Sequence, residues 1–293
     1  MNSILEISGL RKTYPNSDFS LKDISFSLPS GFIMGFVGEN GAGKTTTIGC
    51  ILNTLIKDCG SIKILGKEMD DDSVDIRDEI GVVYDTNVFP EHLTAGQIAS
   101  AMRNIFTNWD DALFTEHLQR FKLPENAKIK TFSRGMTMKL SVAVALSHRP
   151  KLLVLDEATS GLDPIVRDEI LDVFLDFVQD ENHSILLSSH ITSDLEKVAD
   201  YITFIHDGSI IFCETKDVLK YNYGVMRCKA AQFEEIDQED ILAYRKQDYQ
   251  IDVLINDKKT AEKKYRDVVI DNATIEEIML LLVRGEKVGN YEK

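Results

Sequence analysis

Hydrophobic and polar residues alternate along the first part of the chain in a way that predicts β-strands. Residues 4–14 and 19–28 alternate between apolar and polar positions, and the polar residues 15–18 separate them. This pattern indicates two strands of a half-exposed antiparallel sheet. Residues 32–37 instead form a continuous apolar run that leads into a glycine-rich segment, and residues 45–56 have a helical pattern. We therefore expect a buried strand, a turn and a helix to follow the sheet.

Helical and buried-strand patterns alternate through the middle of the chain. Residues 91–130 are expected to be mostly helical, with apolar positions at Leu93, Ile98, Met102, Ile105 and Leu118. Buried strands are expected at residues 152–155 and 184–188, and helices at 135–147 and 164–178. Strands that alternate with helices predict a mostly parallel sheet covered on both faces.

The last part of the chain begins with a hairpin pattern and then becomes more charged. Asp207 and Gly208 lie between two apolar runs, and this pair is preferred in tight two-residue turns, so a hairpin is expected over residues 201–214. Four further elements are expected after residue 220: strands near Val225, at 249–255 and at 267–270, and a helix at 275–283 that begins with a Thr274–Glu277 capping box.

Length and patterning together predict one large domain and a smaller one. The 293 residues are enough for a domain of residues 1–220, with a helical subdomain at about residues 87–148, and a small α+β appendage of residues 221–293. Hydrophobic residues make up 43% of the chain and charged residues 28%, as in an ordinary globular protein. The sequence has no apolar run long enough to span a bilayer and no secretory signal, so neither feature is expected.

The charge and the cysteines narrow the classes of partner and site. The chain has 48 acidic and 33 basic residues, a net charge of −15, and no basic run, so binding to nucleic acid is not expected. The cysteines have no zinc-type spacing and are expected to be reduced, mostly buried thiols. They are Cys50, Cys59, Cys213 and Cys228.

A phosphate-binding motif follows the first buried strand. Residues 38–45 match the pattern G-x-x-x-x-G-K-[ST] between a strand and a helix, the context that distinguishes the motif from a chance glycine-rich turn. Its glycines allow backbone N–H groups to surround phosphate oxygens at a helix N-terminus. Lys44 is expected to contact the β- and γ-phosphates, and the Thr45 hydroxyl to bind Mg²⁺. The expected nucleotide contacts are Gly38, Asn40, Gly41, Ala42, Gly43, Lys44, Thr45 and Thr46.

Two acidic residues follow the strand at 152–155. Ligands bind beyond the carboxyl ends of strands in open α/β sheets, and Asp156 and Glu157 lie at such an end. Asp156 suits the Mg²⁺ position, directly or through water, and Glu157 can take a proton from the attacking water. The alternative is a pair of carboxylates that cap the next turn. Similarly, Ser133 and Gly135 begin another helix, where they either donate to a phosphate or simply cap the helix.

The ordered set of motifs resembles the ATP-binding subunit of ABC transporters over residues 1–220, in the bacterial branch with a separate permease chain. It comprises residues 38–45, the S-x-G sequence at 133–136, the L-L-V-L-D-E strand, S-G-L-D at 160–163, and His190. The resemblance implies a P-loop NTPase core with a mostly parallel sheet, an N-terminal antiparallel β subdomain and a helical subdomain. It also implies two ATP molecules held between two subunits, each contacting the signature Ser133 and Gly135 of the opposite subunit.

The resemblance implies further roles for single residues. Tyr14 matches the aromatic residue that stacks on adenine, although it could instead pack at the end of its strand. Asp163 matches the aspartate that links the subunits and can also be a helix N-cap, and His190 matches the histidine that contacts the γ-phosphate. Asp85 stands where the family has Gln or Glu, so it binds Mg²⁺ or water, or else caps a turn. Arg134 and Met136 also depart from the family signature.

The expected function is therefore an ATPase, using ATP and Mg²⁺, that drives a separate integral membrane permease. The resemblance implies a homodimer, or a heterodimer with a similar subunit, at the cytoplasmic face of the membrane, and it suggests export. The catalytic residues are expected to be Lys44, Glu157 and His190. The alternative is a soluble ABC-type ATPase acting on ribosomes or DNA, a class that usually has two ATP domains or a coiled-coil insertion. A GTPase is disfavoured because no N-K-x-D motif occurs.

Overall fold

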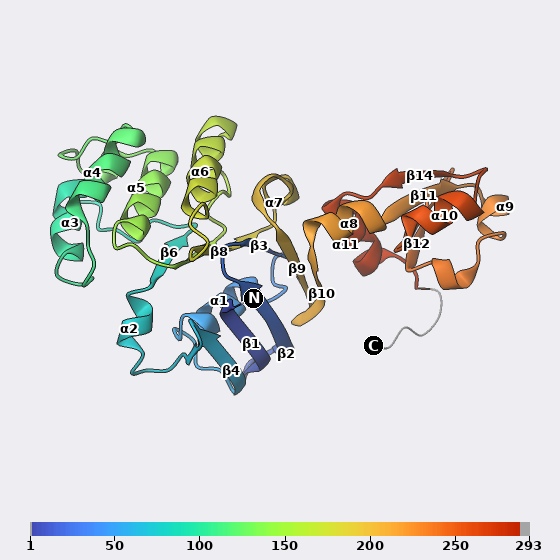
Figure 1. Ribbon diagram of the computed structural model, residues 1–293, viewed down its shortest axis with the longest axis horizontal. Coiled ribbons are helices and arrows are strands. Elements are labelled where there is room, and N and C mark those ends of the chain that lie inside the picture. Colours follow the sequence, from blue (N-terminus) through green and yellow to red (C-terminus); the bar gives the residue numbers. More distant parts are fainter. Residues whose placement is uncertain (1, 288–293) are drawn as a thin grey trace. The chain divides into compact units, whose positions relative to one another are not determined.

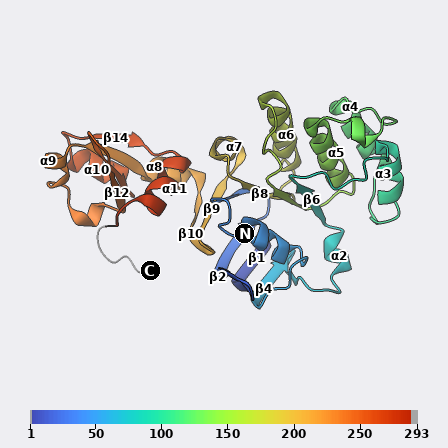
Figure 2. The ribbon, with the colours of Figure 1, turned by 180° about the vertical axis from the view of Figure 1, so that it is seen from behind.

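A computed structural model describes residues 2–287 and divides the chain into two compact units, Met1–Cys213 and Glu214–Lys293. The boundary predicted at residue 220 falls inside helix α8, Lys216–Asn222, and the units divide before that helix. Figures 1 and 2 show the two units from opposite sides. Within residues 2–287, no helix combines the length and apolar character needed to cross a bilayer.

The N-terminal strands form a four-stranded antiparallel sheet in the order β2-β1-β4-β5. Along much of β1 and β2, buried apolar positions alternate with exposed polar ones, as the sequence predicts, and the pairing of the two strands has several irregularities in register. The strands are β1 (Ser3–Tyr14), β2 (Ser17–Pro29), β4 (Cys59–Ile64) and β5 (Lys67–Glu68).

The second sheet of this unit has six strands in the order β10-β9-β3-β8-β7-β6. The pairs β9–β3, β3–β8, β8–β7 and β7–β6 are parallel, which confirms the predicted mostly parallel sheet. The strands are β3 (Ile33–Val37), β6 (Ile80–Tyr84), β7 (Leu152–Asp156), β8 (Ser184–Ser189), β9 (Tyr201–His206) and β10 (Ser209–Thr215). Every residue of β3, β7 and β8 is buried, because the sheet is covered on both faces.

Different layers cover the two faces of this sheet. Helices α5 (Arg134–Leu146), α6 (Pro164–Phe177) and α7 (Thr192–Val198) lie on one side, and the antiparallel sheet and α1 (Lys44–Ile51) lie on the other (Figures 1 and 2). One apolar core joins residues of the antiparallel sheet, α1 and the parallel strands, including Leu5, Ile24, Phe36, Ile48 and Leu186. The phosphate-binding segment therefore emerges from a rigid, closely packed support.

Helix α1 ends earlier than the sequence pattern predicts. It stops at Ile51 rather than residue 56, because Asn53 adopts a left-handed conformation with φ of 54°. The N–H groups of Thr54 and Leu55 then bond back to the Gly49 carbonyl, which satisfies a helix C-terminal acceptor.

The predicted helical segment at 91–130 consists of two separate helices, α3 (Ala95–Met102) and α4 (Asp111–Arg120), followed by a 3₁₀ turn, η1 (Ile129–Thr131). Ile98 and Leu118 are buried as expected, but Ile105 lies beyond the end of α3 and is 64% exposed. Within residues 2–287, two helices precede α3: α1 and the short α2 (Val74–Arg77).

The second unit is a four-stranded sheet with helices, in the order β12-β13-β11-β14. The predicted capping box at Thr274 and Glu277 is present at the start of α11. Strand β12 and the helices α8, α9 and α10 are additional to the prediction. The elements are α8, β11 (Gly224–Cys228), α9 (Ala230–Phe233), η2 (Gln238–Asp240), β12 (Ala243–Lys246), β13 (Ile251–Ile255), α10 (Lys258–Lys264), β14 (Val269–Asn272) and α11 (Ile275–Arg284).

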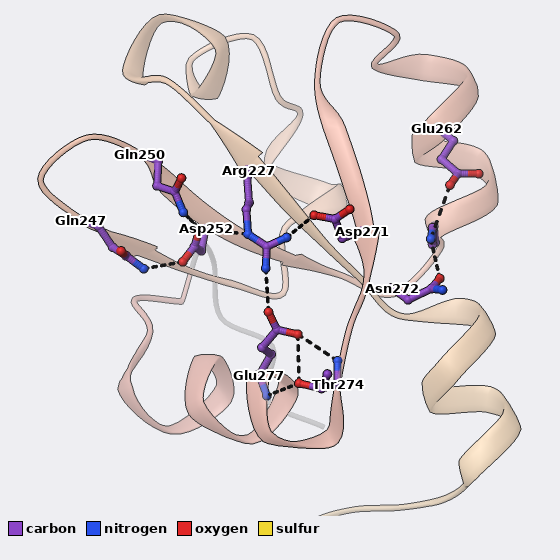
Figure 3. A network of polar contacts seen from close by, with 10 residues as sticks. Arg227, Gln247, Gln250, Asp252, Glu262, Asp271, Asn272, Thr274 and Glu277 are labelled. Atoms are coloured by element: carbon purple, nitrogen blue, oxygen red, sulfur yellow. Dashed lines mark hydrogen bonds and ion pairs between the residues drawn. The ribbon is translucent and has the colours of Figure 1, made fainter. Parts of the chain in front are cut away.

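A charged network joins four elements of the second unit. Arg227 on the central strand β11 forms ion pairs with Asp252 on β13, Asp271 on β14 and Glu277 on α11 (Figure 3). The contact to Glu277 is 2.7 Å long, and Glu277 also accepts hydrogen bonds from Thr274 in the capping box. Arg227 thus connects the sheet directly to the first turn of α11.

Candidate functional site

The segment at residues 38–45 is shaped by the strand before it and the helix after it. Strand β3 ends at Val37, and α1 begins at Lys44. Gly43, the helix N-cap, has φ of 117°, a conformation that L side chains rarely adopt. A Cβ at Gly38 would lie 2.4 Å from the Ile205 carbonyl of β9, so only glycine fits there. The backbone N–H groups at the start of α1 are therefore free of side-chain capping and favour an anion.

Lys44 is held in this loop by oxygen atoms. Its Nζ donates to the carbonyl oxygens of Gly38, at 2.8 Å, and Glu39, at 3.2 Å. It also forms an ion pair with Glu157 Oε1 at 3.3 Å, and its side chain is only 6% exposed. A buried ammonium requires such partners, and phosphate oxygens could replace them.

Glu157 joins Lys44 to His190. It follows directly after β7, and its other carboxylate oxygen, Oε2, lies 2.6 Å from His190 Nδ1. His190 follows directly after β8, which pairs with β7, so the ends of the two parallel strands bring these side chains together. The three predicted catalytic residues thus form one connected cluster in the structure.

Asp156 is the buried carboxylate of the site. Its Oδ1 has no hydrogen-bond partner among residues 2–287, and burial raises the pKa of the group, while a hydrogen bond with the Thr45 side chain acts in the opposite direction. An unpartnered buried carboxylate oxygen beside a hydroxyl matches the oxygen ligands that Mg²⁺ prefers. These residues therefore fit the metal that the sequence predicts. In the described part of the chain, no three His, Cys, Asp or Glu side chains gather as a metal site, so the fit depends on Thr45 as well as carboxylates.

The cluster lies in a cavity of about 510 Å³, large enough for a small organic ligand. Most predicted phosphate-loop residues line it, together with Asp85, whereas Gly38 and Ala42 do not. Three lining residues, Phe19, Glu39 and Ser160, are not among the predicted nucleotide contacts. The lining residues are Phe19, Glu39, Asn40, Gly41, Gly43, Lys44, Thr45, Thr46, Asp85, Glu157, Ser160 and His190.

Tyr14 lies next to this cavity rather than in its lining. Its ring centroid is 6.5 Å from that of Phe19, at an angle of 33° between the rings. The Nζ atom of Lys12 lies 5.5 Å from the Tyr14 ring centroid and makes a cation–π contact with this ring. Phe19 was missed because it is an apolar position in an alternating strand, where packing alone explains an aromatic residue.

The predicted signature residues Ser133 and Gly135 lie outside the lining of the cavity. Ser133 is the exposed N-cap of α5, and its hydroxyl accepts a hydrogen bond from the Met136 N–H at 3.2 Å. Asp163 is the N-cap of α6 and accepts from the N–H groups of Ile165 and Val166. Both residues therefore cap helices in this chain, and their predicted contacts across a dimer remain predictions.

The four cysteines are all free thiols, and only two of them are buried. Cys50 and Cys228 are buried, whereas Cys59 and Cys213 are exposed, so the prediction that these thiols are mostly buried holds for half of them. Burial raises the pKa of both buried thiols and so keeps them protonated. None of the four lines the cavity.

Comparison with known proteins agrees with this geometry. The ABC transporter family model matches residues 21–160. The ATP-binding protein YtrB of Bacillus subtilis is 31% identical over 220 residues, which cover 75% of each chain. The bacitracin transport ATP-binding protein BcrA of Bacillus licheniformis is 34% identical over 72% of this chain and 69% of its own. The lantibiotic transport ATP-binding protein SrtF of Streptococcus pyogenes is 33% identical over 71% of this chain and 89% of its own.

Solved structures show the same fold. The ATP-binding subunit of an ABC transporter is 27% identical, with a TM-score of 0.66, and covers 74% of this chain and 92% of its own. A dimeric ATP-binding cassette in a post-hydrolysis state with ADP and Pi has a TM-score of 0.65, 20% identity, and coverage of 72% and 98%. The motifs, the cavity and these similarities agree, and the chain belongs to the family of ABC transporter ATP-binding proteins.

Proposed function

We propose that this chain hydrolyses ATP in the cavity described above and thereby drives a separate membrane permease. The observation that carries the proposal is the connected cluster of Lys44, Glu157 and His190 beside a glycine-rich helix N-terminus. A cation, a carboxylate and an imidazole at a phosphate-binding loop can bind phosphate, accept a proton from water and contact the γ-phosphate, and these roles suit phosphoryl transfer to water.

Glu157 acts as the general base in this proposal. The two oxygens of its carboxylate contact Lys44 and His190, which are also the groups expected to contact phosphate. When the phosphates take over Lys44 as a partner, the carboxylate is released to accept a proton from water. His190 is 47% exposed at its side chain, so it can follow the γ-phosphate rather than remain fixed.

Thr45, Asp156 and Asp85 would hold Mg²⁺, and the ion would neutralise charge on the transferred phosphate. Asp156 is the most restricted of the three, because it is buried at the end of β7, whose residues are all buried. Asp85 follows β6 at the neighbouring strand end and lines the cavity, although its side chain is one methylene shorter than the Gln or Glu usual in the family. Tyr14, adjacent to the cavity, would contact the adenine.

Two copies are required to complete each site. Ser133 and Gly135 begin a helix of 13 residues whose N-terminus favours an anion, yet they do not line the cavity of their own chain. A second subunit, identical or similar, would bring its signature residues to the phosphate, with Asp163 near the contact. ATP would favour this closed dimer through contacts that ADP cannot make.

The coupled process is transport by a permease on another chain, at the cytoplasmic face of the membrane. The relatives named for bacitracin and lantibiotic transport support transport as the coupled process, and export is the direction that we propose. The net charge of −15 favours a protein partner over nucleic acid.

Replacement of the proposed base tests this function. Glu157→Gln keeps the size of the side chain but cannot accept the proton, so turnover should fall by at least about 100-fold. ATP should still bind. Steady-state hydrolysis and equilibrium nucleotide binding are measured on the same full-length preparations, with Glu39→Gln as the control for loss of a cavity carboxylate. Turnover of Glu157→Gln at the wild-type rate would contradict the assignment.

A further inference from the structure

Two segments that line the cavity continue directly into adjacent helices. The loop at residues 160–163, which includes Ser160, leads into α6 at Pro164. His190 is followed by α7, which begins at Thr192. The first turns of α6 and α7 are therefore extensions of two walls of the proposed nucleotide site.

One arginine contacts both extensions. Arg167, in the first turn of α6, donates from Nη2 to the carbonyl oxygen of Leu162 at 3.2 Å. Its Nη1 lies 3.7 Å from Oδ1 of Asp194, in the first turn of α7. The Asp194 side chain is only 6% exposed. A buried carboxylate thus faces a guanidinium that also holds the loop before Asp163.

The pairing between these two side chains is incomplete. A separation of 3.7 Å exceeds the length of a hydrogen bond, whereas arginine and carboxylate groups commonly form two such bonds in parallel. Arg167 Nε and Asp194 Oδ2 are both buried, and neither has a hydrogen-bond partner in the part of the chain that the structure describes, residues 2–287. An approach of α7 toward α6 would bring Nη1 of Arg167 within hydrogen-bond distance of the Asp194 carboxylate.

Helix capping and general packing do not explain this arrangement. Asp163 already caps α6, so the N–H groups of that helix do not need Arg167. A second ion pair, between Lys197 and Asp168, also joins α7 to α6, but both of its side chains are exposed. A buried, half-formed pair is costly unless another state of the protein completes it.

We propose that Arg167 and Asp194 are a positioning pair for ATP hydrolysis, which sets His190 relative to the loop at residues 160–163. The pair closes when both segments engage the nucleotide, so that the ordering of one wall of the cavity is transmitted to the other. This inference rests on the proposed ATPase function. Neither residue touches substrate in this role, and both act by placing His190 relative to the loop.

Asp194→Asn tests the proposal because it preserves shape and removes the charge that pairs with Arg167. The kcat for ATP should fall by about 10- to 100-fold through misplacement of His190, while the KM changes by less than about threefold. Asp194→Glu, whose longer side chain can span the gap, should recover most of kcat. Asp168→Asn, which breaks the exposed ion pair between the same helices, should retain the wild-type kcat. Thermal unfolding of each full-length variant shows whether it is folded.

A double-mutant cycle separates positioning from stability. In a His190→Ala background, Asp194→Asn should cause almost no additional loss of single-turnover rate, because its effect passes through the missing imidazole. If Asp194→Asn does not fold, Arg167→Lys replaces it, because lysine cannot contact Leu162 and Asp194 in the same way.

Two results would overturn the inference: a wild-type kcat in Asp194→Asn or its substitute, or an undiminished loss in the His190→Ala background. An inactive wild-type chain would instead contradict the proposed ATPase function, so the two failures are distinguishable.

Discussion

Glu157 adopts a backbone conformation that is uncommon for a residue with a side chain. Its φ is 55°, in the left-handed region, immediately after a fully buried strand. Such strain persists only where the surroundings enforce it, and here the Lys44 ion pair and the His190 contact hold the side chain in place. The residue most directly assigned to chemistry is therefore positioned by both its backbone and its two partners.

Lys44→Ala should weaken ATP binding by about 10- to 100-fold, because a charge-assisted contact contributes roughly 1.5–3 kcal/mol. The fold should persist, since Glu157 keeps its contact with His190 and the loop backbone is formed by glycine geometry. Titration of nucleotide against folded protein measures the change, and Lys67→Ala, at an exposed lysine of β5, is the control. Equal affinities of the two variants would show that the loop does not hold phosphate through Lys44.

At the scale of elements, local patterns predicted some features closely and missed others for identifiable reasons. The hairpin turn was predictable because Asp207 and Gly208 have φ of 44° and 71°, which the two-residue turn requires and these residue types tolerate. The end of α1 depends instead on the conformation of Asn53, which no periodic pattern specifies. Phe19 reaches the cavity through tertiary packing of β2, and this too has no local signal.

The second unit shows a similar limit. Helix α11 was predictable from its capping box and apolar face, whereas β12 has only four residues and contacts a partner strand that follows it in the chain. The ion pairs of Arg227 were not predictable either, because the register of β11 with β13 and β14 brings their partners together. Short elements with a mixed composition depend on such tertiary contacts.

Arg227→Gln should lower the free energy of unfolding of the second unit by about 1–3 kcal/mol. The change leaves the carboxylates of Asp252, Asp271 and Glu277 close together without their shared cation. Faster amide hydrogen exchange should appear in β11, β14 and the first turn of α11. Exchange measured by mass spectrometry on the full chain tests this, with Arg266→Gln as a matched change at an exposed position of the same unit. Unchanged protection from hydrogen exchange would show that the Arg227 ion pairs do not stabilise this unit.

At the scale of the whole molecule, the proposed site is divided between elements that one chain does not bring together. Lys44 and Glu157 line the cavity, whereas Ser133 caps a helix outside its lining. Two copies related by a twofold axis would form two equivalent sites, each with donors on both sides of the phosphate. The specific activity of the wild-type chain should therefore rise with protein concentration, and a constant value on dilution would contradict the shared site.

Complementation between two inactive variants provides the sharper test. Lys44→Ala removes the phosphate contact of one subunit, and Ser133→Arg places a bulky cation at the signature of the other. In a mixed dimer, one site contains both changes and the other contains neither, because each site takes Lys44 and Ser133 from different subunits. ATPase activity should return to about half the wild-type rate in the mixed dimer when the sites act independently. A mixed dimer, verified by two different affinity tags, that stays as inactive as its parents would contradict independent sites composed in this way. Mixing Lys44→Ala with Glu157→Gln is the matched control, because both changes affect the same half of the site. Each of the two sites in that mixed dimer carries one of the two changes, so activity should not return.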